Sequence, residues 1–231
     1  MSPDNSNVTI RYAAESDIPR LVDIAAAAFN DHPFYVYIYP GRKEHPTAWR
    51  DYWHREIVTQ YFSATAIMVV AEEKATGTVL SFAIWLVFIE GYTNPGLLTF
   101  GNPELLKGYP GLPNENEKDD PAQDLAAIAE LEEAVGCNRR EQWNEGNGPG
   151  SSPIPHWWLR VLATDPQHQG RGMGTRLMDW GCDKANSDGV VTGLYCSSEG
   201  LPYYLKSKFV KTGELRFGPL VAPVCVRTAV S

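Results

Sequence analysis

The sequence contains few cysteines and no long apolar run, and these absences exclude several classes of protein. Its four cysteines are widely spaced and include no Cys-x-x-Cys pair, so we expect buried thiols rather than a disulfide framework or a metal site. No stretch of about 18 apolar residues occurs, and residues 1–7 lack the basic start and apolar core of a signal peptide. We therefore expect no membrane partner and a cytoplasmic location, with a nuclear one left open.

The sequence also lacks a basic cluster. Residues 90–155 contain 12 acidic and 4 basic side chains, and this segment accounts for the whole net charge of -8. An acidic chain without a basic stripe has no electrostatic footprint for nucleic acid. We expect a small-molecule partner, no nucleic acid, and a monomer or a homodimer. A length of 231 residues suits one domain with an insertion.

The stretch 157–186 is the most informative part of the chain and predicts a strand, a turn and a helix. The bulky apolar run 157–163 ends at Asp165-Pro166, because proline cannot donate to a strand partner. Three glycines at alternate positions follow: Gly170, Gly172 and Gly174. They permit a tight turn and a close ligand. The unpaired amides at the start of the following helix then predict a site for a phosphate or pyrophosphate.

A glycine turn before a helix can also serve packing alone. The spacing is neither the G-x-G-x-x-G of dinucleotide-binding folds nor a Walker loop, because no Gly-Lys-Ser/Thr follows. A second motif is needed to choose between packing and anion binding.

The segment Gln169–Gly174 matches the Q/R-x-x-G-x-G/A pattern of the GNAT superfamily of acyl-CoA-dependent N-acetyltransferases. A second match lies downstream, where the predicted strand 190–196 is followed by residues 197–209. This segment resembles N-x-x-A-x-x-L-Y-x-x-x-G-F, with Tyr204 at the tyrosine position and Phe209 at the phenylalanine position. Ser197 takes the place of the asparagine, and Lys208 that of the glycine. The second segment is locally similar to puromycin-type antibiotic N-acetyltransferases.

This resemblance implies an α/β GNAT fold, with a mixed sheet of six to seven strands flanked by helices and acetyl-CoA as cosubstrate. Tyr204 would be the catalytic acid that protonates the departing thiolate. The resemblance also implies a set of residues that bind the cosubstrate. Those near the pantetheine arm are Leu162, Ala163, Thr164 and Ser197, and those at the pyrophosphate are Gln169, Gly170, Arg171, Gly172, Met173, Gly174 and Thr175.

Hydrophobic patterns predict the remaining elements. Strands are expected at 8–12, 66–73, 78–88 and 220–227, with a further strand opening at 209–210, and helices at 18–29 and 47–62. Pro223 suggests a bulge or a sheet edge in the last strand. Residues 90–155 are interpreted as an insertion between the third and fourth strands, with a helical pattern only over 121–135.

The segment His32–Pro40 is interpreted as an aromatic loop bounded by prolines. Dense aromatics often serve packing alone. In the GNAT family, however, the segment after the first helix lines the acceptor pocket, so the resemblance suggests acceptor contacts for Phe34, Tyr35 and Tyr37.

Three functions remain open from the sequence. The leading one is acetyl transfer to a small-molecule primary amine. The others are acetylation of a protein amino terminus or lysine, and acyl-CoA binding without turnover. His156, Glu199, Glu90 or a water chain could act as the base. If the insertion helix covers the site, its carboxylates would attract a cationic amine.

Overall fold

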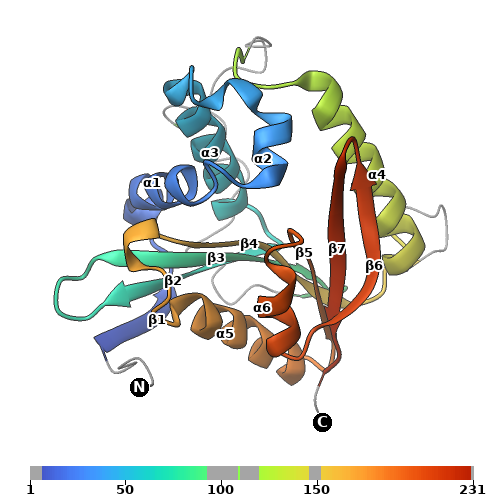
Figure 1. Cartoon of the computed structure of the whole chain (residues 1–231). Helices are drawn as coiled ribbons and strands as arrows, with labels where there is room; N and C mark the ends of the chain where they lie inside the picture. Colours follow the sequence, from blue (N-terminus) through green and yellow to red (C-terminus); the bar gives the residue numbers. More distant parts are fainter. Residues whose placement is uncertain (1–6, 93–108, 110–119, 146–151, 230–231) are drawn as a thin grey trace.

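The computed structural model describes residues 7–92, 109, 120–145 and 152–229. A seven-stranded mixed sheet forms its centre, in the order β1-β2-β3-β4-β5-β7-β6 (Figure 1). The pair β4–β5 is parallel and the other neighbouring pairs are antiparallel. The strands are β1 (Val8–Tyr12), β2 (Ala66–Glu73), β3 (Val79–Phe88), β4 (His156–Thr164), β5 (Val191–Tyr195), β6 (Val210–Phe217) and β7 (Leu220–Arg227). This confirms the predicted fold class.

Helices cover both faces of the sheet (Figure 1). On one face lie α1 (Ile18–Ala28), α2 (Pro33–Ile38) and α3 (Pro46–Tyr61), and on the other lie α5 (Met173–Ser187) and α6 (Leu201–Lys206). The sheet therefore separates two apolar cores, one against α1 and α3 and one against α5. A third, smaller cluster joins the β6–β7 hairpin to α2 and α4 (Leu125–Trp143).

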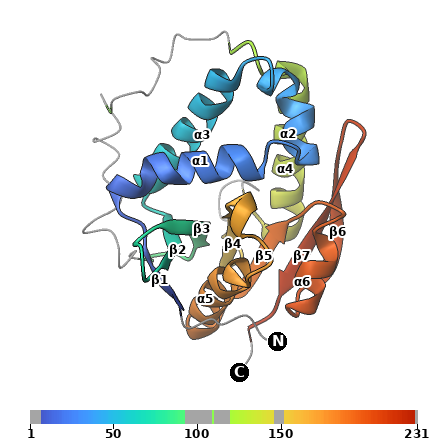
Figure 2. The same cartoon turned by 60° about the vertical axis from the view of Figure 1, so that its left-hand side comes forward.

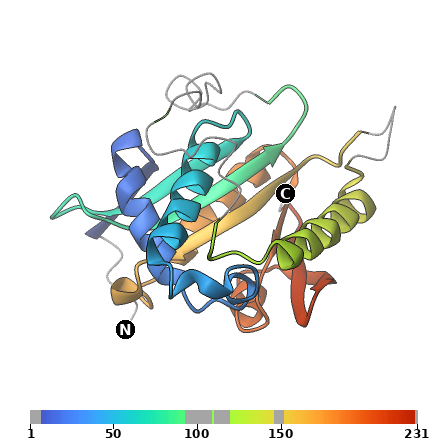
Figure 3. The same cartoon turned by 90° about the horizontal axis from the view of Figure 1, so that it is seen from above.

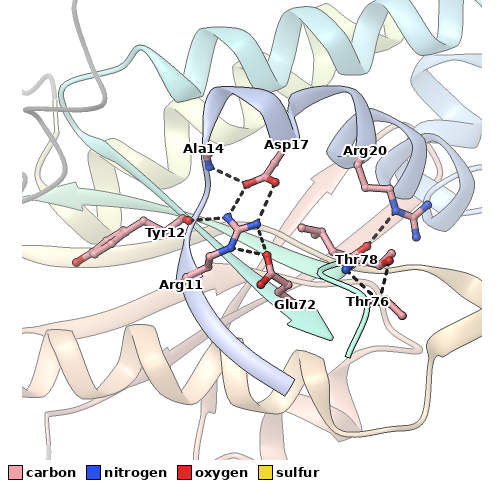
Figure 4. Close-up of polar contacts among 9 residues, drawn as sticks. Arg11, Tyr12, Ala14, Asp17, Arg20, Glu72, Thr76 and Thr78 are labelled. Carbon is pink, nitrogen blue, oxygen red and sulfur yellow. Dashed lines mark hydrogen bonds and ion pairs between the residues drawn. The ribbon is translucent and has the colours of Figure 1, made fainter. Parts of the chain in front are cut away.

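The N-terminal strand is tied to the first helix by a half-buried ion-pair network (Figure 4). Arg11 of β1 donates to Asp17 at 2.7 Å and to Glu72 of β2 at 2.7 Å. Asp17 also accepts from the backbone N–H of Ala14 at 2.7 Å. One guanidinium therefore fixes the start of α1 relative to two strands.

A second arginine ties α1 to the start of the glycine turn. Arg20 donates through Nε to the carbonyl of Val79 at 3.0 Å, and its terminal amino group pairs with the carboxylate of Asp165. Asp165 directly follows β4, so α1 and the turn are held together.

The segment predicted as an aromatic loop contains a helix, and this prediction was wrong. Helix α2 spans six residues, with Pro33 in its first turn and His32 Nδ1 accepting from Phe34 N at 3.4 Å. Proline at the first helical position fits because its missing N–H would have no partner there. Six residues are too few to be stable alone. The helix is held instead by the packing of Tyr35 against α3 and of Phe34 against Phe217.

The insertion helix begins and ends later than its pattern indicated. It starts after Asp124, whose carboxylate caps Ala126 N and Ala127 N, and it continues through Trp143 to Asn144 in a left-handed conformation. Its last two turns lack apolar periodicity and are fixed by packing, because Asn138 and Trp143 are both buried. In Figures 2 and 3 this helix lies beside the β6–β7 hairpin.

Pro223 marks neither an edge nor a bulge. Strand β7 lies between β5 and β6, and the irregular step of the β6–β7 ladder falls between Lys211 and Gly213. Pro223 accepts from Cys196 N at 3.1 Å, just beyond the last β5–β7 pair. Its missing N–H is tolerated because the β5–β7 ladder ends there, while Pro223 stays paired with Glu214 of β6.

The four cysteines are free, and three of them are buried. None of the described helices combines the length and apolar character needed to cross a membrane.

Candidate active site

Strands β4 and β5, in the middle of the sheet, pair over only part of the length of β4. They pair from His156–Val191 to Leu159–Leu194, while β4 continues to Thr164 paired to β3. In the described part of the chain, no strand covers the β5-facing side of β4 beyond Leu159. An extended ligand can therefore add to this side of β4 as a strand would.

A bulge at Arg160 changes which side chains of β4 face which core. Trp85 of β3 pairs with Leu159 and Ile84 pairs with Val161, so Arg160 is the extra residue. Before the bulge Leu159 packs in the α5-side core, and after it Val161 packs in the α1-side core. Arg160 is 41% exposed in the middle of this strand.

The glycine turn has the backbone conformation that its composition indicated. Gly170 and Gly172 have φ of +75° and +79°, in the left-handed region where other residues are strained. Helix α5 starts immediately after Gly172, with no side chain capping it. The first bond back into the turn is from Arg176 N to Gly172 O, so the N–H groups of residues 173–175 precede the helical ladder. These amides lie at the positive end of the helix dipole.

Gly174 differs from the other two glycines, because its φ is not positive. A Cβ at this position would lie 3.4 Å from the hydroxyl of Tyr203 and 3.8 Å from Thr164 Oγ1, which are ordinary van der Waals distances. Tyr203 in turn donates to Thr175 Oγ1 at 3.3 Å. The backbone and packing at this position would therefore also accept an alanine.

One cavity of about 900 Å³ connects the glycine turn with the space under α1, α2 and α4. It brings together all the residues predicted to bind the cosubstrate, and Tyr204 with them. These are Leu162, Ala163, Thr164, Gln169, Gly170, Arg171, Gly172, Met173, Gly174, Thr175 and Ser197.

Tyr204 lies on α6, where its ring packs edge-on against Phe209 and Tyr203. Burial raises the pKa of its phenol well above the usual value, so the hydroxyl stays protonated over the physiological range. The wall of the cavity therefore contains a neutral phenol, which can donate a hydrogen bond.

One of the two departures from the second motif has a structural explanation, and the other, Lys208, has none. Ser197 Oγ accepts a hydrogen bond from Gly200 N at 3.1 Å and so stabilises the turn before α6. The O–H of Ser197 remains able to donate to a second group. Lys208 has φ of +67°. Its backbone adopts the conformation that favours glycine, although a lysine stands there.

The structure separates the three aromatic residues proposed for acceptor binding. Phe34 and Tyr35 line the cavity, whereas Tyr37 does not. The Tyr37 hydroxyl donates to Glu130 at 2.8 Å. Helix α2 points successive residues to different sides, so an extended-loop interpretation could not distinguish them.

Of the three candidate bases, only His156 lines the cavity. Its ring lies between Phe88 and Trp143, with centroid distances of 4.6 Å and 4.0 Å, and Nδ1 is 2.7 Å from the carbonyl of Ile154. Burial lowers its pKa to about 4, so the imidazole is neutral near pH 7 and weakly basic. Glu90 is exposed, and neither it nor Glu199 is in the lining.

The cavity also contains an ion pair that the sequence did not predict. Glu56 of α3 accepts from Arg160 Nε, beside Tyr35 and Tyr52. Two signals could have found it. Arg160 is the one charged residue in the apolar run 157–163, and Glu56 follows Tyr52 by one helical turn.

Helix α4 forms a wall of the cavity with Leu131, Val135 and Arg139. Its acidic residues Glu130, Glu133 and Glu141 line a separate hollow shared with Glu214 of β6. The acidic side of α4 therefore faces away from the cavity, and no attraction of a cationic amine follows from it. Within the described residues, no group of three or more acidic, histidine or cysteine side chains is arranged to hold a metal ion.

Comparisons with known proteins agree with this architecture. A family model described as "Acetyltransferase (GNAT) family" matches residues 97–205. An acetyltransferase of Stachybotrys chartarum is 24% identical over 210 residues, which cover 90% of this chain and 82% of that protein.

Two solved structures have the same fold. The first, named histone acetyltransferase HPA2 and related acetyltransferase, from Corynebacterium glutamicum, has a TM-score of 0.61 at 19% identity, covering 97% of this chain and 98% of that one. The second, PaiA N-acetyltransferase of Thermoplasma acidophilum, was solved in complex with coenzyme A. It has a TM-score of 0.53 at 11% identity, covering 96% of this chain and 98% of that one.

Proposed function

Because the chain is an acetyl-CoA-dependent acetyltransferase of the GNAT family, we propose that it acetylates a primary amine of a small molecule by direct attack in a ternary complex. One observation carries this proposal. A single cavity joins the amides of the glycine turn, the side of β4 left uncovered beyond Leu159 and an aromatic chamber under α2. Both substrates would therefore be held at once, which direct transfer requires.

In this proposal the cosubstrate lies along β4. The amides after Gly172 bind its pyrophosphate, and the side of β4 that faces β5 binds its pantetheine arm. An N–H of this strand near Leu162 polarises the thioester carbonyl, which makes the carbon more electrophilic. Ser197 adds a hydroxyl donor at the opposite side of the opening.

The proposed reaction forms a bond between the amine nitrogen and the carbonyl carbon and breaks the carbon–sulfur bond. Tyr204 donates its proton to the departing thiolate and recovers one from water. The amine loses one proton to water, since the low pKa of His156 makes it a poor base. Held next to the sulfur, a phenol of high pKa still donates, because a free thiolate buried in the cavity is less stable than the thiol.

We also propose that residues 1–231 form one acetyltransferase domain in which the insertion 90–155 walls the acceptor chamber. Leu131 and Val135 of α4 line the same cavity as Phe34 and Tyr35. Aromatic and aliphatic walls on several sides favour a compact acceptor over a protein chain.

The test is a release assay for free thiol, with acetyl-CoA fixed and a panel of small amines, peptides and lysine-containing proteins as acceptors. Thiol release with small amines, and not with peptides, is expected. Calorimetry with coenzyme A provides the control for the cosubstrate site. Absence of binding heat, or turnover with peptides alone, would contradict the proposal.

A further inference from the structure

The acceptor end of the cavity contains a charged group in an otherwise aromatic setting. Arg160 leaves β4 at the bulge, and its Nε donates to Glu56 of α3. The arginine side chain is 41% exposed, whereas that of the glutamate is 15% exposed. Both residues line the cavity. The guanidinium is therefore the more exposed partner of an ion pair in the cavity wall.

The guanidinium has most of its hydrogen-bonding capacity left. It carries five N–H donors, of which the bond to Glu56 uses the one on Nε. Among the described residues, the two terminal amino groups of Arg160 have no hydrogen-bond acceptor. Two parallel N–H groups on this edge match the two oxygens of a carboxylate.

The surroundings favour an anion at this edge. Tyr35 and Tyr52 lie in the field of both charges, and burial raises the pKa of both phenols, so each hydroxyl remains a neutral donor. The charged side chains of the cavity are three arginines and two glutamates: Arg139, Arg160, Arg171, Glu56 and Glu145. Glu145 is paired with Arg139 at 2.7 Å, as Glu56 is with Arg160. The cavity is thus not an acidic site for a polycation.

We propose that the terminal amino groups of Arg160 bind a carboxylate of the acceptor, so that the acceptor class is amino acids and related amino carboxylates with an apolar or aromatic side chain. This inference rests on the proposed acetylation of a small amine. Glu56 is a positioning residue in it, because its contact with Nε turns the other edge of the guanidinium towards the cavity. Phe34 and the α4 side chains Leu131 and Val135 would contact the apolar part of the acceptor.

The sharpest test compares apolar amino acids with their carboxamides, which have nearly the same size and lack the carboxylate charge. Because the amides also have less basic amines, the change of the ratio between wild type and variant is the readout. With the wild-type protein, kcat/KM for phenylalanine is expected to exceed that for phenylalanine amide by about 100-fold. In Arg160→Gln the ratio of the kcat/KM values for phenylalanine and its amide should fall close to one, with the KM for acetyl-CoA unchanged. Arg160→Lys should retain part of the preference, since lysine keeps the charge without the two-pronged donor.

A matched control is Arg50→Gln. Arg50 lies on α3 like Glu56, and its exposed ion pair is with Asp23 of α1, so its removal should leave the preference for the acid over the amide intact. Coenzyme A binding by each variant establishes that it is folded. If Arg160→Gln does not fold, Arg160→Lys and Glu56→Gln decide the matter, and Glu56→Gln should raise the acceptor KM more than it lowers kcat.

A preference that survives in Arg160→Gln, or equal turnover of acids and amides by the wild type, would overturn the assignment. Absence of turnover with every amine would instead overturn the proposed function. In that event, calorimetry of 3-phenylpropionate with the coenzyme A complex decides on the carboxylate site. Heat with the wild type and none with Arg160→Gln supports it, and no heat with the wild type refutes it.

Discussion

The two ends of the cavity are built in different ways. At the cosubstrate end, the candidate contacts are main-chain groups of a turn and a strand, positioned by glycines of positive φ and the uncovered side of β4. At the acceptor end, the candidate contacts are aromatic and charged side chains from α2, α3, α4 and the bulge of β4. The first end is local in sequence. The second draws on residues separated by more than 100 positions, such as Glu56 and Arg160.

This difference explains where each kind of specificity can arise. A site made of backbone amides tolerates changes in most side chains, provided the chain can adopt the turn, so it suits a ligand that stays the same. A site made of side chains changes with every substitution, so it suits a varied acceptor.

The largest effect is expected at Tyr204, which lines the cavity that connects the two ends. Tyr204→Phe removes the proposed proton donor and should lower kcat by about 100-fold, with coenzyme A affinity unchanged. The neighbouring Tyr203→Phe is the matched control, because that hydroxyl contacts Thr175 and not the proposed reacting atoms, and a loss below about threefold is expected. Steady-state kinetics measures both, and full activity in Tyr204→Phe would remove the tyrosine from the mechanism.

The acceptor end is expected to be the acid-sensitive one. The folded protein keeps His156 neutral with a pKa near 4, whereas the unfolded chain binds a proton near pH 6.5. The unfolded state therefore gains protons first as pH falls, and from pH 7 to pH 5 this residue should lower the free energy of unfolding by about 2 kcal/mol.

His156→Phe keeps the ring between Phe88 and Trp143 and removes the titration. Urea unfolding at pH 7 and pH 5 should show a smaller loss for this variant than for the wild type. The exposed His45→Gln should leave the wild-type acid sensitivity in place. Equal losses in the wild type and His156→Phe would place the acid sensitivity elsewhere.

The cosubstrate end should respond to backbone changes. Gly172→Ala places a Cβ on a residue with φ of +79° at the head of α5, and coenzyme A affinity should fall about 10-fold as the turn shifts. Gly189→Ala is the control, because Gly189 has φ of +70° with open space around its Cβ position and does not line the cavity. It should cost similar stability without changing the affinity in calorimetry. If both variants bind coenzyme A equally well, the turn is not the anion site.

The smallest effect is expected at Lys208, which has a glycine-like backbone conformation near Tyr204. Lys208→Gly relieves the positive φ and should raise the free energy of unfolding by about 1 kcal/mol, with kcat unchanged. Lys206→Gly, on the helix just before it, should have the opposite sign, because glycine weakens a helix. Chemical denaturation measures the free energy of unfolding of both variants. A lower value for Lys208→Gly would mean that contacts of the lysine side chain stabilise the fold by more than the positive φ destabilises it.

The positions of the strands and of most helices along the chain could be predicted from the sequence because each has a local pattern. The apolar runs of β2 and β3 predict strands, and the glycines between β4 and α5 predict a turn, without reference to distant residues. Helix α2 and the last two turns of α4 could not be predicted, since neither is stable without its neighbours. Helix α2 is stabilised by packing of Phe34 against Phe217, and the end of α4 by burial of Trp143.

The candidate site divides in the same way. The sequence predicted residues 162–164, 169–175, Ser197 and Tyr204 of the cavity lining, because these lie in two contiguous motifs that resemble those of the GNAT family. It did not predict the lining residues His168, Gly200 and Tyr203 beside them. It did not predict the Glu56–Arg160 pair, and it grouped Tyr37 with Phe34 and Tyr35 because an aromatic cluster has no direction until its backbone conformation is known.

The sequence by itself determined the glycine turn and the strand before it, since these depend on the conformational limits of glycine and proline. Tyr204 was identified by the resemblance of its segment to the GNAT motif. Only the tertiary structure decided what faces the acceptor. A one-residue bulge in β4 sends Arg160 into the cavity, and the packing of α4 turns its acids away from it. Both results depend on contacts between distant segments, whose geometry no local pattern contains.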